Sequence, residues 1–504
     1  MNKNFINKKI NDLKSLKDLL KNKKFTLVHG VFDVLHVGHK RHFETAKKLT
    51  GLLVVSLTSD KYVKKGPGRP YFNQFIRSEM VSSLETVNYV YINDNETPID
   101  LINKIKPSYY CKGSDYMNFS KDVTGNIKKE VDAIKKVGGK IHFTNDLQFS
   151  SSQLININFN SSKILNEIKT NVKKLSVFKN QVFNYLNKLK NLKIAIIGEI
   201  IEDEYIYSNN LSQPSKEFIH AVERVKSEIF IGGSYAIAKN IIEFSKSVDV
   251  FSAGNFDNNF KNKIKNNNKN NIKLFNLDPN FSVVKKSRYL NNNKKLFECY
   301  SYRGKNKIPN INKTQLKKIA KKIKSYDCVI LSDFGHGFFS KDLFNLIKKE
   351  ANFLSINVQT NAGNRGFNLA TKYKKADNIL LDLPELQLAT GNRSDKIENQ
   401  INNIKHQINS RYYTITKGKN GIYIYDKHLN NKFSLSAFET KPLDTMGAGD
   451  SVLGIASMLL CLKAPLSIVA YLSNLFGAIS TSIIGHSNYI KKKEILKSIE
   501  YGLK

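Results

Sequence analysis

The chain has 504 residues, more than a single hydrophobic core normally serves, so two or three domains are expected. Hydrophobic residues make up 41% and charged residues 24%, a balance that excludes a disordered chain. The net charge of +37 comes from lysines spread over the whole length, with no basic stripe of interleaved aromatics, so no nucleic-acid partner is expected. The positive field would instead attract phosphorylated substrates.

Residues 1–24 form a Lys- and Asn-rich N-terminal extension without the apolar region of a signal peptide. The four cysteines lie far apart and form no Cys-x-x-Cys pair, which gives no zinc ribbon and suits a reducing compartment. A cytoplasmic location is therefore expected. The long apolar stretch 451–484 is interrupted by Lys463 and Pro465, which predicts two buried helices; a membrane span is the alternative, and no membrane partner is expected.

Residues 25–156 alternate strand-like apolar runs with helical patterns. The strand candidates are residues 25–29, 52–57, 89–92 and 140–143. This βαβ rhythm predicts a doubly wound α/β domain. Residues 157–191 are polar and helix-compatible and are expected to be a linker. A strand at residues 193–197 then opens a second α/β domain, which occupies residues 192–504.

The first candidate site begins at His29, where the sequence reads HGVFDVLHVGHKRHFETAKKL. His36 and His39 stand three residues apart at an expected helix start, beside free backbone N–H groups that attract phosphate. Gly38 would keep the backbone close to the phosphates because it has no side chain. Taken alone, the His-x-Gly-His pattern fits ordinary surface or metal-binding histidines better.

Further segments in the same domain favour the phosphate-binding site over ordinary surface or metal-binding histidines. They are LTSD at 57–60, KKGPGRP at 64–70, a helix expected to begin at Arg77, YYCKGSDY at 109–116, and the closing segment 135–156. In this order the domain resembles the adenylyltransferase half of bifunctional heptose kinase/adenylyltransferases, within the HxGH nucleotidyltransferase superfamily. The resemblance implies a Rossmann-like fold in which a sugar phosphate displaces pyrophosphate at a nucleotide α-phosphorus. Positioning and charge neutralisation would carry that reaction.

The resemblance also implies roles for single residues. His36 and His39 would be catalytic, and Asp33 a turn or substrate-binding residue. For Arg77 a structural ion pair and a ligand contact both remain open. His29, His42 and His142 are expected to be structural. The residues assigned to nucleotide or phosphate binding are Gly30, Phe32, Lys65, Lys112, Ser150, Ser151 and Ser152.

The second candidate site lies in DTMGAGDSVLGIASMLL, which begins at Asp444. Its small residues at 447–449 let main-chain N–H groups point at an anion where an apolar helix begins. Asp450 stands at that place, where a carboxylate would accept the proton of an attacking sugar hydroxyl during γ-phosphoryl transfer. The alternative is a glycine-rich turn with Asp450 as a helix N-cap.

This segment resembles the signature of the ribokinase (PfkB) family of sugar kinases, and other pieces follow in the family's order. The resemblance implies a ribokinase-like doubly wound fold, ATP as substrate, Mg²⁺ organised indirectly by Glu385, and Asp450 as the catalytic base. A homodimer through this domain is expected on the same ground. The residues assigned to nucleotide and phosphate are Gly447, Ala448, Gly449, Asp382, Glu385, Thr416, Gly418 and Asn474, and those assigned to the sugar are Asp203, Gly232 and Gly233.

Three positions depart from the kinase pattern. Ala236 stands where the family usually has an Asn that binds the sugar, and Asp382 replaces the Asn of an Asn-x-x-Glu motif. Asn357-Val358-Gln359 stand where heptose kinases have Asp-Pro-Lys. Asn240, one helical turn beyond Ala236, is a candidate replacement. Loss of a substrate hydrogen bond costs about 1–3 kcal/mol, which covers both a changed substrate and a weakened kinase.

The two expected activities form consecutive steps. A kinase acting on the anomeric hydroxyl of heptose 7-phosphate would make the sugar 1-phosphate that an adenylyltransferase then converts to an activated sugar. In the familiar fused enzymes the kinase comes first, so the order here is inverted. The alternatives are a cytidylyltransferase that uses CTP and another phosphate monoester, and a silent kinase-like domain that serves as a scaffold or sugar sensor.

Overall fold

The computed structural model describes residues 8–66, 68–113, 126–144, 166–168, 175–211, 219, 221–267, 272–291, 294–303, 308–438 and 442–503. It contains two compact units. Unit 1 comprises Met1–Leu165 together with Lys493–Lys504, and unit 2 comprises Asn166–Lys492. The chain therefore leaves unit 1 once and returns to it at the C-terminal end, a connection that the expected boundaries of 156 and 192 did not include.

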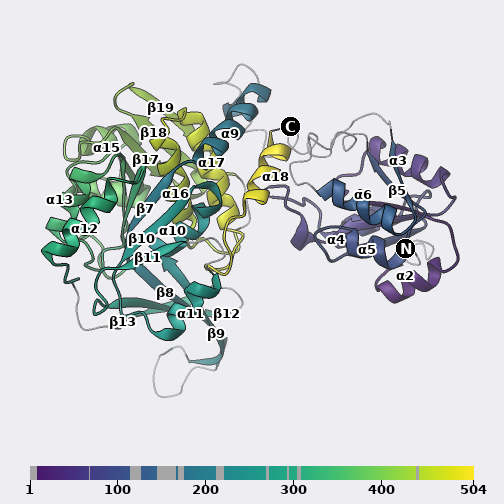
Figure 1. The fold of residues 1–504 in the computed structure, drawn as a ribbon, viewed down its shortest axis with the longest axis horizontal. Helices are drawn as coiled ribbons and strands as arrows, with labels where there is room; N and C mark the ends of the chain where they lie inside the picture. The colour runs from purple at the N-terminus through teal and green to yellow at the C-terminus, as the bar shows by residue number, and fades with distance from the viewer. Residues whose placement is uncertain are drawn as a thin grey trace. The chain divides into compact units, whose positions relative to one another are not determined.

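Unit 1 is built around a six-stranded parallel sheet with the strand order β1-β4-β3-β2-β5-β6. Strand β5 of this sheet is labelled in Figure 1. Its strands are β1 (Lys9–Ile10), β2 (Thr26–Gly30), β3 (Leu53–Thr58), β4 (Tyr89–Asn93), β5 (Tyr109–Gly113) and β6 (Lys140–Thr144). Its helices are α2 (Leu13–Leu20), α3 (Val37–Lys48), α4 (Gln74–Ser82), α5 (Ile99–Ile105), α6 (Asn126–Lys136) and α18 (Lys492–Gly502), which enters unit 1 at Lys493.

Both faces of this sheet are buried, which explains the continuous apolar runs of its central strands. Leu27 and Val54 point into one core, and Val28 and Val55 into the other. The strand order reverses between β2 and β5, which makes the carboxyl end of β2 the expected place for a ligand. The strands predicted in this region are confirmed, with ends shifted by a residue.

Two local features of unit 1 differ from expectation. The N-terminal extension is part of the domain, because β1 pairs with β4, and α2 buries Leu16 and Leu20 in the core. Helix α4 begins at Gln74, three residues before Arg77. The side chain of Asn73 accepts hydrogen bonds from the backbone of Phe75 and Ile76, which caps the helix at the earlier position.

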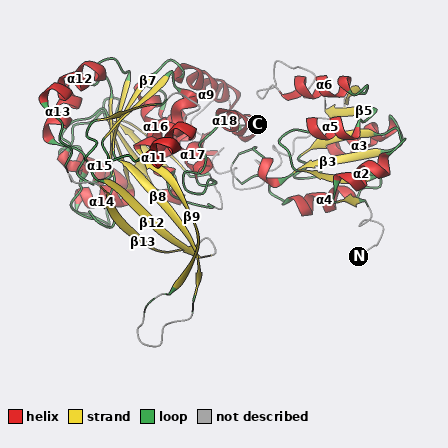
Figure 2. Ribbon diagram, turned by 60° about the horizontal axis from the view of Figure 1, so that its bottom comes forward, coloured by secondary structure: helices red, strands yellow, loops and turns green. Residues whose placement is uncertain are grey.

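Unit 2 contains a nine-stranded sheet with the order β11-β10-β7-β14-β15-β16-β17-β18-β19, parallel except at β18 and β19. Figure 2 shows its second, four-stranded sheet, with the order β13-β12-β8-β9. The strands are β7 (Lys193–Gly198), β8 (Ile200–Asn210), β9 (Val222–Gly233), β10 (Ser247–Ser252), β11 (Lys273–Asn276), β12 (Val283–Asn291), β13 (Lys294–Arg303), β14 (Cys328–Asp333), β15 (Leu354–Val358), β16 (Asn378–Asp382), β17 (Tyr412–Thr416), β18 (Ile422–Asp426) and β19 (Asn431–Leu435).

The helices of unit 2 cover the larger sheet, whose order reverses between β7 and β14. They are α9 (Leu175–Leu189), α10 (Ser234–Ile241), α11 (Asn258–Asn267), α12 (Lys313–Ile323), α13 (Lys341–Glu350), α14 (Leu383–Thr390), α15 (Ile397–Ile404), α16 (Ala448–Cys461) and α17 (Leu466–Ser480). Helix α9 lies in the expected linker, yet it packs into unit 2 through buried residues such as Phe178, whose ring lies 5.7 Å from that of Tyr471.

The apolar stretch 451–484 forms the two buried helices predicted for it. Helices α16 and α17 are separated by Lys463, which adopts a left-handed conformation (φ 52°), and by Pro465, the N-cap of α17. Within the described residues, no helix is both long and apolar enough to cross a membrane.

Candidate active sites

The paired histidines of unit 1 lie at the start of α3, directly after β2. His36 is the N-cap of that helix, and its ring stacks on the ring of His39 with a centroid distance of 3.8 Å. The Nδ1 atom of His39 is buried and has no hydrogen-bond partner among the described residues. Burial lowers the pKa of His39 to about 3, helped by the charges of His36, Lys65 and His42. The imidazole rings are therefore neutral at pH 7 and Lys65 is the cation near this helix start, which together with the free backbone N–H groups suits a polyphosphate.

The backbone before α3 is shaped to bring an aromatic ring under His39. Phe32 has a left-handed conformation (φ 49°), and its ring lies edge-on to that of His39 at 5.2 Å. A Cβ atom at Gly30 would come within 2.9 Å of the Phe32 ring. This close packing requires glycine at position 30. Contact of Gly30 or Phe32 with a nucleotide remains a prediction.

Asp33 holds a loop and does not face solvent. Its carboxylate accepts hydrogen bonds from the backbone N–H groups of Tyr71 and Phe72, each at 2.9 Å, and lies 3.7 Å from the guanidinium of Arg69. The loop that Asp33 fixes follows the KKGPGRP segment. A few residues earlier in that segment, the ammonium group of Lys65 lies over the ring of Tyr501 of α18 at 4.8 Å. The C-terminal helix is therefore part of the surroundings of this site.

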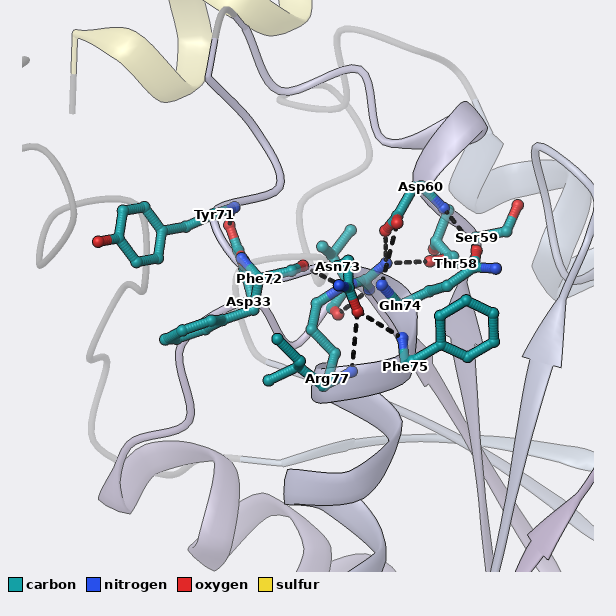
Figure 3. Close-up of polar contacts among 12 residues, drawn as sticks. Asp33, Thr58, Ser59, Asp60, Tyr71, Phe72, Asn73, Gln74, Phe75 and Arg77 are labelled. Carbon is teal, nitrogen blue, oxygen red and sulfur yellow. Dashed lines mark hydrogen bonds and ion pairs between the residues drawn. The ribbon is translucent and has the colours of Figure 1, made fainter. Parts of the chain in front are cut away.

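The side chain of Arg77 is surrounded by protein groups to which it is hydrogen-bonded, as Figure 3 shows. Its side chain is fully buried and donates hydrogen bonds to the carbonyl groups of Val31, Thr58 and Phe72. It also forms an ion pair of 2.6 Å with Asp60. Each of the three guanidinium nitrogens donates to a protein group, so the geometry favours the structural ion pair over the ligand contact.

Among the remaining predicted phosphate ligands of unit 1, Lys112 lies near His29 and His42, whose pKa values are lowered by burial and then by the charge of Lys112. Lys112 is buried and forms a 3.0 Å ion pair with Glu130. Although burial acts in the opposite direction, Tyr110 and Glu130 raise the pKa of Lys112. Ser150, Ser151 and Ser152 lie outside the described residues.

In unit 2 the glycine-rich turn forms a helix start as predicted. Gly447 is the N-cap of α16 with a left-handed conformation (φ 77°), and a Cβ atom there would come within 2.6 Å of the His486 ring. Ala448 and Gly449 are the first residues of the helix, and Asp450 is the third. Asp450 is therefore not the N-cap. Its Oδ1 atom accepts a 2.8 Å hydrogen bond from Nε2 of Gln359 instead.

Buried carboxylates gather near Asp450. Burial raises the pKa of Asp450 to about 6. Burial likewise raises the pKa of Glu385 to about 8, with further contributions from the charges of Asp382 and Asp450. Asp382 and Glu385 form a reciprocal capping box at the start of α14, and Glu385 also accepts a hydrogen bond from the Thr360 backbone. The change from Asn to Asp at position 382 thus preserves the cap.

The donor set fits a magnesium ion. Glu385 and Asp450 are two buried carboxyl groups that interact electrostatically, and the charge of Lys286 also acts on Asp450. Mg²⁺ is commonly bound by one or two carboxylates together with substrate phosphates. Among the described residues, no group of three or more His, Cys, Asp or Glu side chains has the geometry of a complete metal site.

The expected sugar-binding residues lie together at the ends of β8 and β9. A Cβ atom at Gly232 would come within 2.1 Å of Oδ2 of Asp203, so only glycine fits there. Gly233 has a left-handed conformation (φ 64°) that starts α10. Asn240 is not placed as a replacement ligand, because its amide donates to Ser451 Oγ and accepts from the Ile490 backbone.

The residues assigned to the nucleotide base lie at the far end of the large sheet. Thr416 ends β17, and Gly418 follows it with a left-handed conformation (φ 54°). The amide of Asn474 donates to the carbonyl groups of Leu435 and Ser436. Asn474 thus fixes the end of β19, and its contact with a nucleotide remains a prediction.

Two structural carboxylates had no assigned role in the sequence. Asp444, the first residue of the DTMGAGD segment, accepts hydrogen bonds from Tyr205, Lys295, Met446 and Gly485. Glu199 accepts the backbone N–H groups of Phe334 and His336 at the topological switch between β7 and β14. The place of Asp444 at the start of a glycine-rich segment was the available signal, but three of its four donors, those of Tyr205, Lys295 and Gly485, come from distant segments.

Comparison with known proteins supports this division into two sites. Residues 27–171 match the cytidylyltransferase-like family, and residues 257–492 match the pfkB family of carbohydrate kinases. Unit 1 is similar to the bifunctional protein HldE of Aliarcobacter butzleri, with 44% identity over 121 residues, which are 23% of this chain and 25% of that protein. HldE of Nitratiruptor sp. is 44% identical over 128 residues, 25% of this chain and 27% of that protein.

The aligned part thus spans about a quarter of the length of these curated relatives. Among solved structures, phosphofructokinase-2 from Escherichia coli in complex with potassium has 13% identity and a TM-score of 0.48, covering 62% of this chain and 100% of that one. The chain joins a cytidylyltransferase-like domain to a C-terminal pfkB-family carbohydrate kinase domain, in that order.

Proposed function

We propose that this chain makes an activated sugar in two steps, phosphorylating heptose 7-phosphate at O1 with ATP and then transferring AMP to the product. The observation that carries the proposal is that one chain holds both helix starts, with His36 and His39 at one and Asp450 at the other. The similarity of unit 1 to the bifunctional HldE proteins supports the same pairing of activities.

In the kinase step Asp450 accepts the proton of the O1 hydroxyl. The oxygen then forms a bond to the γ-phosphorus of ATP while the bond to the β-phosphate oxygen breaks, and ADP leaves. A buried carboxylate with a pKa of about 6 is ionised at neutral pH and still basic enough for this role. The N–H groups around Gly449 would stabilise the transferred phosphoryl group.

Magnesium would neutralise charge on the ATP phosphates in this step. Glu385 would hold it indirectly, because its carboxylate also accepts the backbone N–H groups of Thr360 and Asp382. Those two bonds fix the orientation of the carboxylate before any ligand binds.

In the second step a phosphate oxygen of the sugar 1-phosphate attacks the α-phosphorus of a second ATP. The bond from that phosphorus to pyrophosphate breaks, and no covalent intermediate with the protein is needed. His36 and His39 would donate hydrogen bonds to the phosphates that gain charge, with Lys65 adding a positive charge nearby.

Phosphorus NMR tests the proposal directly. Incubation of the full chain with heptose 7-phosphate, ATP and Mg²⁺ should give a sugar 1,7-bisphosphate first and pyrophosphate afterwards. Asp450→Asn should stop formation of the bisphosphate, while His39→Asn should let it accumulate. A mixture of the two variants should restore pyrophosphate release. If neither product forms from any sugar phosphate, the proposed function is wrong.

A further inference from the structure

A row of polar residues crosses the four-stranded sheet of unit 2. In the register of that sheet, Asp203 of β8 lies beside Lys286 of β12, which lies beside Tyr300 of β13. Residues directly opposite each other on neighbouring strands project to the same face. Lys286 therefore shares a face with Asp203, the residue expected at the sugar.

Lys286 is a buried cation without a counter-charge in contact. Its side chain belongs to a residue that is only 7% exposed, and its ammonium group lies 5.2 Å from the centre of the Tyr300 ring. No hydrogen bond or ion pair joins it to any residue in the described part of the chain. Arg288, two residues along the same strand, is instead paired with both Asp203 and Glu298. Because a buried unpaired charge is costly, Lys286 is suited to an anionic ligand.

A second unsatisfied group lies near Lys286. The Nε2 atom of His336, in the loop after β14, is buried and has no partner among the described residues. Its ring lies 6.4 Å from that of Tyr300 and 6.2 Å from that of Tyr302. Burial, and then the charge of Lys286, lower the pKa of His336 to about 4. The neutral ring can donate a hydrogen bond from Nε2 to a ligand oxygen.

The charge of Lys286 shows that Lys286 and His336 lie near the proposed base, Asp450. Lys286 lowers the pKa of Asp450 as well as that of His336, so its ammonium group is near both side chains. The backbone N–H of His336 is held by Glu199, which fixes the loop. An acceptor with its hydroxyl at Asp450 would thus extend past Lys286 toward His336.

We propose that Lys286 and His336 bind the phosphate group that the sugar acceptor already carries, away from its reacting hydroxyl. The proposal rests on the function above, in which unit 2 phosphorylates a sugar phosphate. An ammonium group and an imidazole N–H are donors that match phosphate oxygens. With Ala236 at the usual position of the sugar-binding Asn, the phosphate becomes the main feature by which the acceptor is selected.

Lys286 and His336 could equally bind the γ-phosphate of ATP. Two variants at neighbouring positions of β12 distinguish that phosphate from the phosphate of the sugar acceptor. Lys286→Met should raise KM for heptose 7-phosphate about 30-fold, the loss expected for a hydrogen bond to a charged group. At a pH high enough to keep Asp450 ionised without the charge of Lys286, it should leave kcat, the KM for ATP and the KM for the same heptose without phosphate within about threefold. Lys285→Met is the matched control, because Lys285 is paired with Glu204 at 2.9 Å and should leave the KM for heptose 7-phosphate unchanged.

His336→Phe, which keeps a ring but removes the donor, should raise the same KM about tenfold. The proposal is wrong if Lys286→Met lowers kcat equally with both acceptors or raises the KM for ATP, since the ammonium group would then serve the transferred phosphoryl group. It is also wrong if Lys285→Met has the same effect as Lys286→Met.

A binding measurement separates this proposal from the proposed function. Isothermal titration of the full chain with heptose 7-phosphate, without ATP, should show binding that Lys286→Met weakens about 30-fold and Lys285→Met does not. If this pattern appears but no bisphosphate is ever formed, the phosphate site stands and the kinase function fails. If the bisphosphate forms but binding is equal in all three proteins, the kinase function stands and the phosphate site is wrong.

Discussion

Gln359 donates a hydrogen bond of 2.8 Å from its side-chain amide to the carboxylate of Asp450. The heptose-kinase pattern expected from the sequence has a lysine at the position of Gln359. Burial raises the pKa of Asp450 to about 6, and the hydrogen bond from Gln359 acts in the opposite direction because it stabilises the ionised carboxylate. Glutamine in place of lysine at position 359 therefore changes the pKa of Asp450 but leaves Asp450 able to act as the proposed base.

The first prediction concerns the pH dependence of the kinase step. Asp450 must be ionised to accept a proton, so kcat/KM should fall as the pH drops through about 6. Gln359→Leu removes a donor to the ionised form, which raises the pKa and should move this acid limb up by about one pH unit. Gln359→Lys should move it down. Gln407→Leu, at an exposed position, is the control, and a limb that stays in place in Gln359→Leu would contradict the assignment of Asp450.

The second prediction concerns the paired histidines. His36→Asn and His39→Asn should each lower pyrophosphate release about 10²–10³-fold, because the shorter amide side chain does not carry its donor to the position of the ring nitrogen, where phosphates gain charge. Formation of the sugar 1,7-bisphosphate by unit 2 should not change. His406→Asn, at an exposed site, should affect neither step. Equal activity of His39→Asn and the unchanged protein would exclude a catalytic role for this ring.

The third prediction concerns the stability of unit 1. Arg77→Lys keeps the charge but cannot reach the three carbonyl groups and Asp60 together, so it should lower the free energy of unfolding by about 3 kcal/mol. Urea unfolding, with hydrogen exchange of β3 to follow unit 1, measures the loss. Arg41→Lys, at an exposed position in the same unit, should change stability by less than about 0.5 kcal/mol. Comparable losses in both variants would speak against the buried network.

The fourth prediction concerns Asp444. Asp444→Ala leaves the Tyr205 hydroxyl, the Lys295 ammonium and the Gly485 backbone N–H without their acceptor, so the turn before α16 loses its fixed position. The rate of bisphosphate formation should fall about 10–100-fold, since Asp450 lies in the first turn of that helix. Pyrophosphate release from supplied sugar 1-phosphate, measured in the same sample, is the internal control. A loss of both activities would indicate general unfolding.

Local sequence was enough to locate the two helix starts. The turn at Gly447 and the cap at His36 each depend on neighbouring residues, because a helix begins where nearby φ and ψ angles and small side chains allow it. The alternating apolar runs likewise determined that both domains contain buried parallel strands. These features were therefore predicted with nearly the residues that the structure shows.

The tertiary structure alone decided which side chains meet. Lys112, predicted to bind a phosphate, is paired with Glu130, and the side-chain amide of Asn240 is hydrogen-bonded to Ser451 and Ile490. Strand register places Lys286 beside Asp203, and the return of residues 493–504 brings α18 into unit 1. Partners far apart in the chain are selected by the packing of whole elements, and the burial that sets their charges arises only when those elements come together.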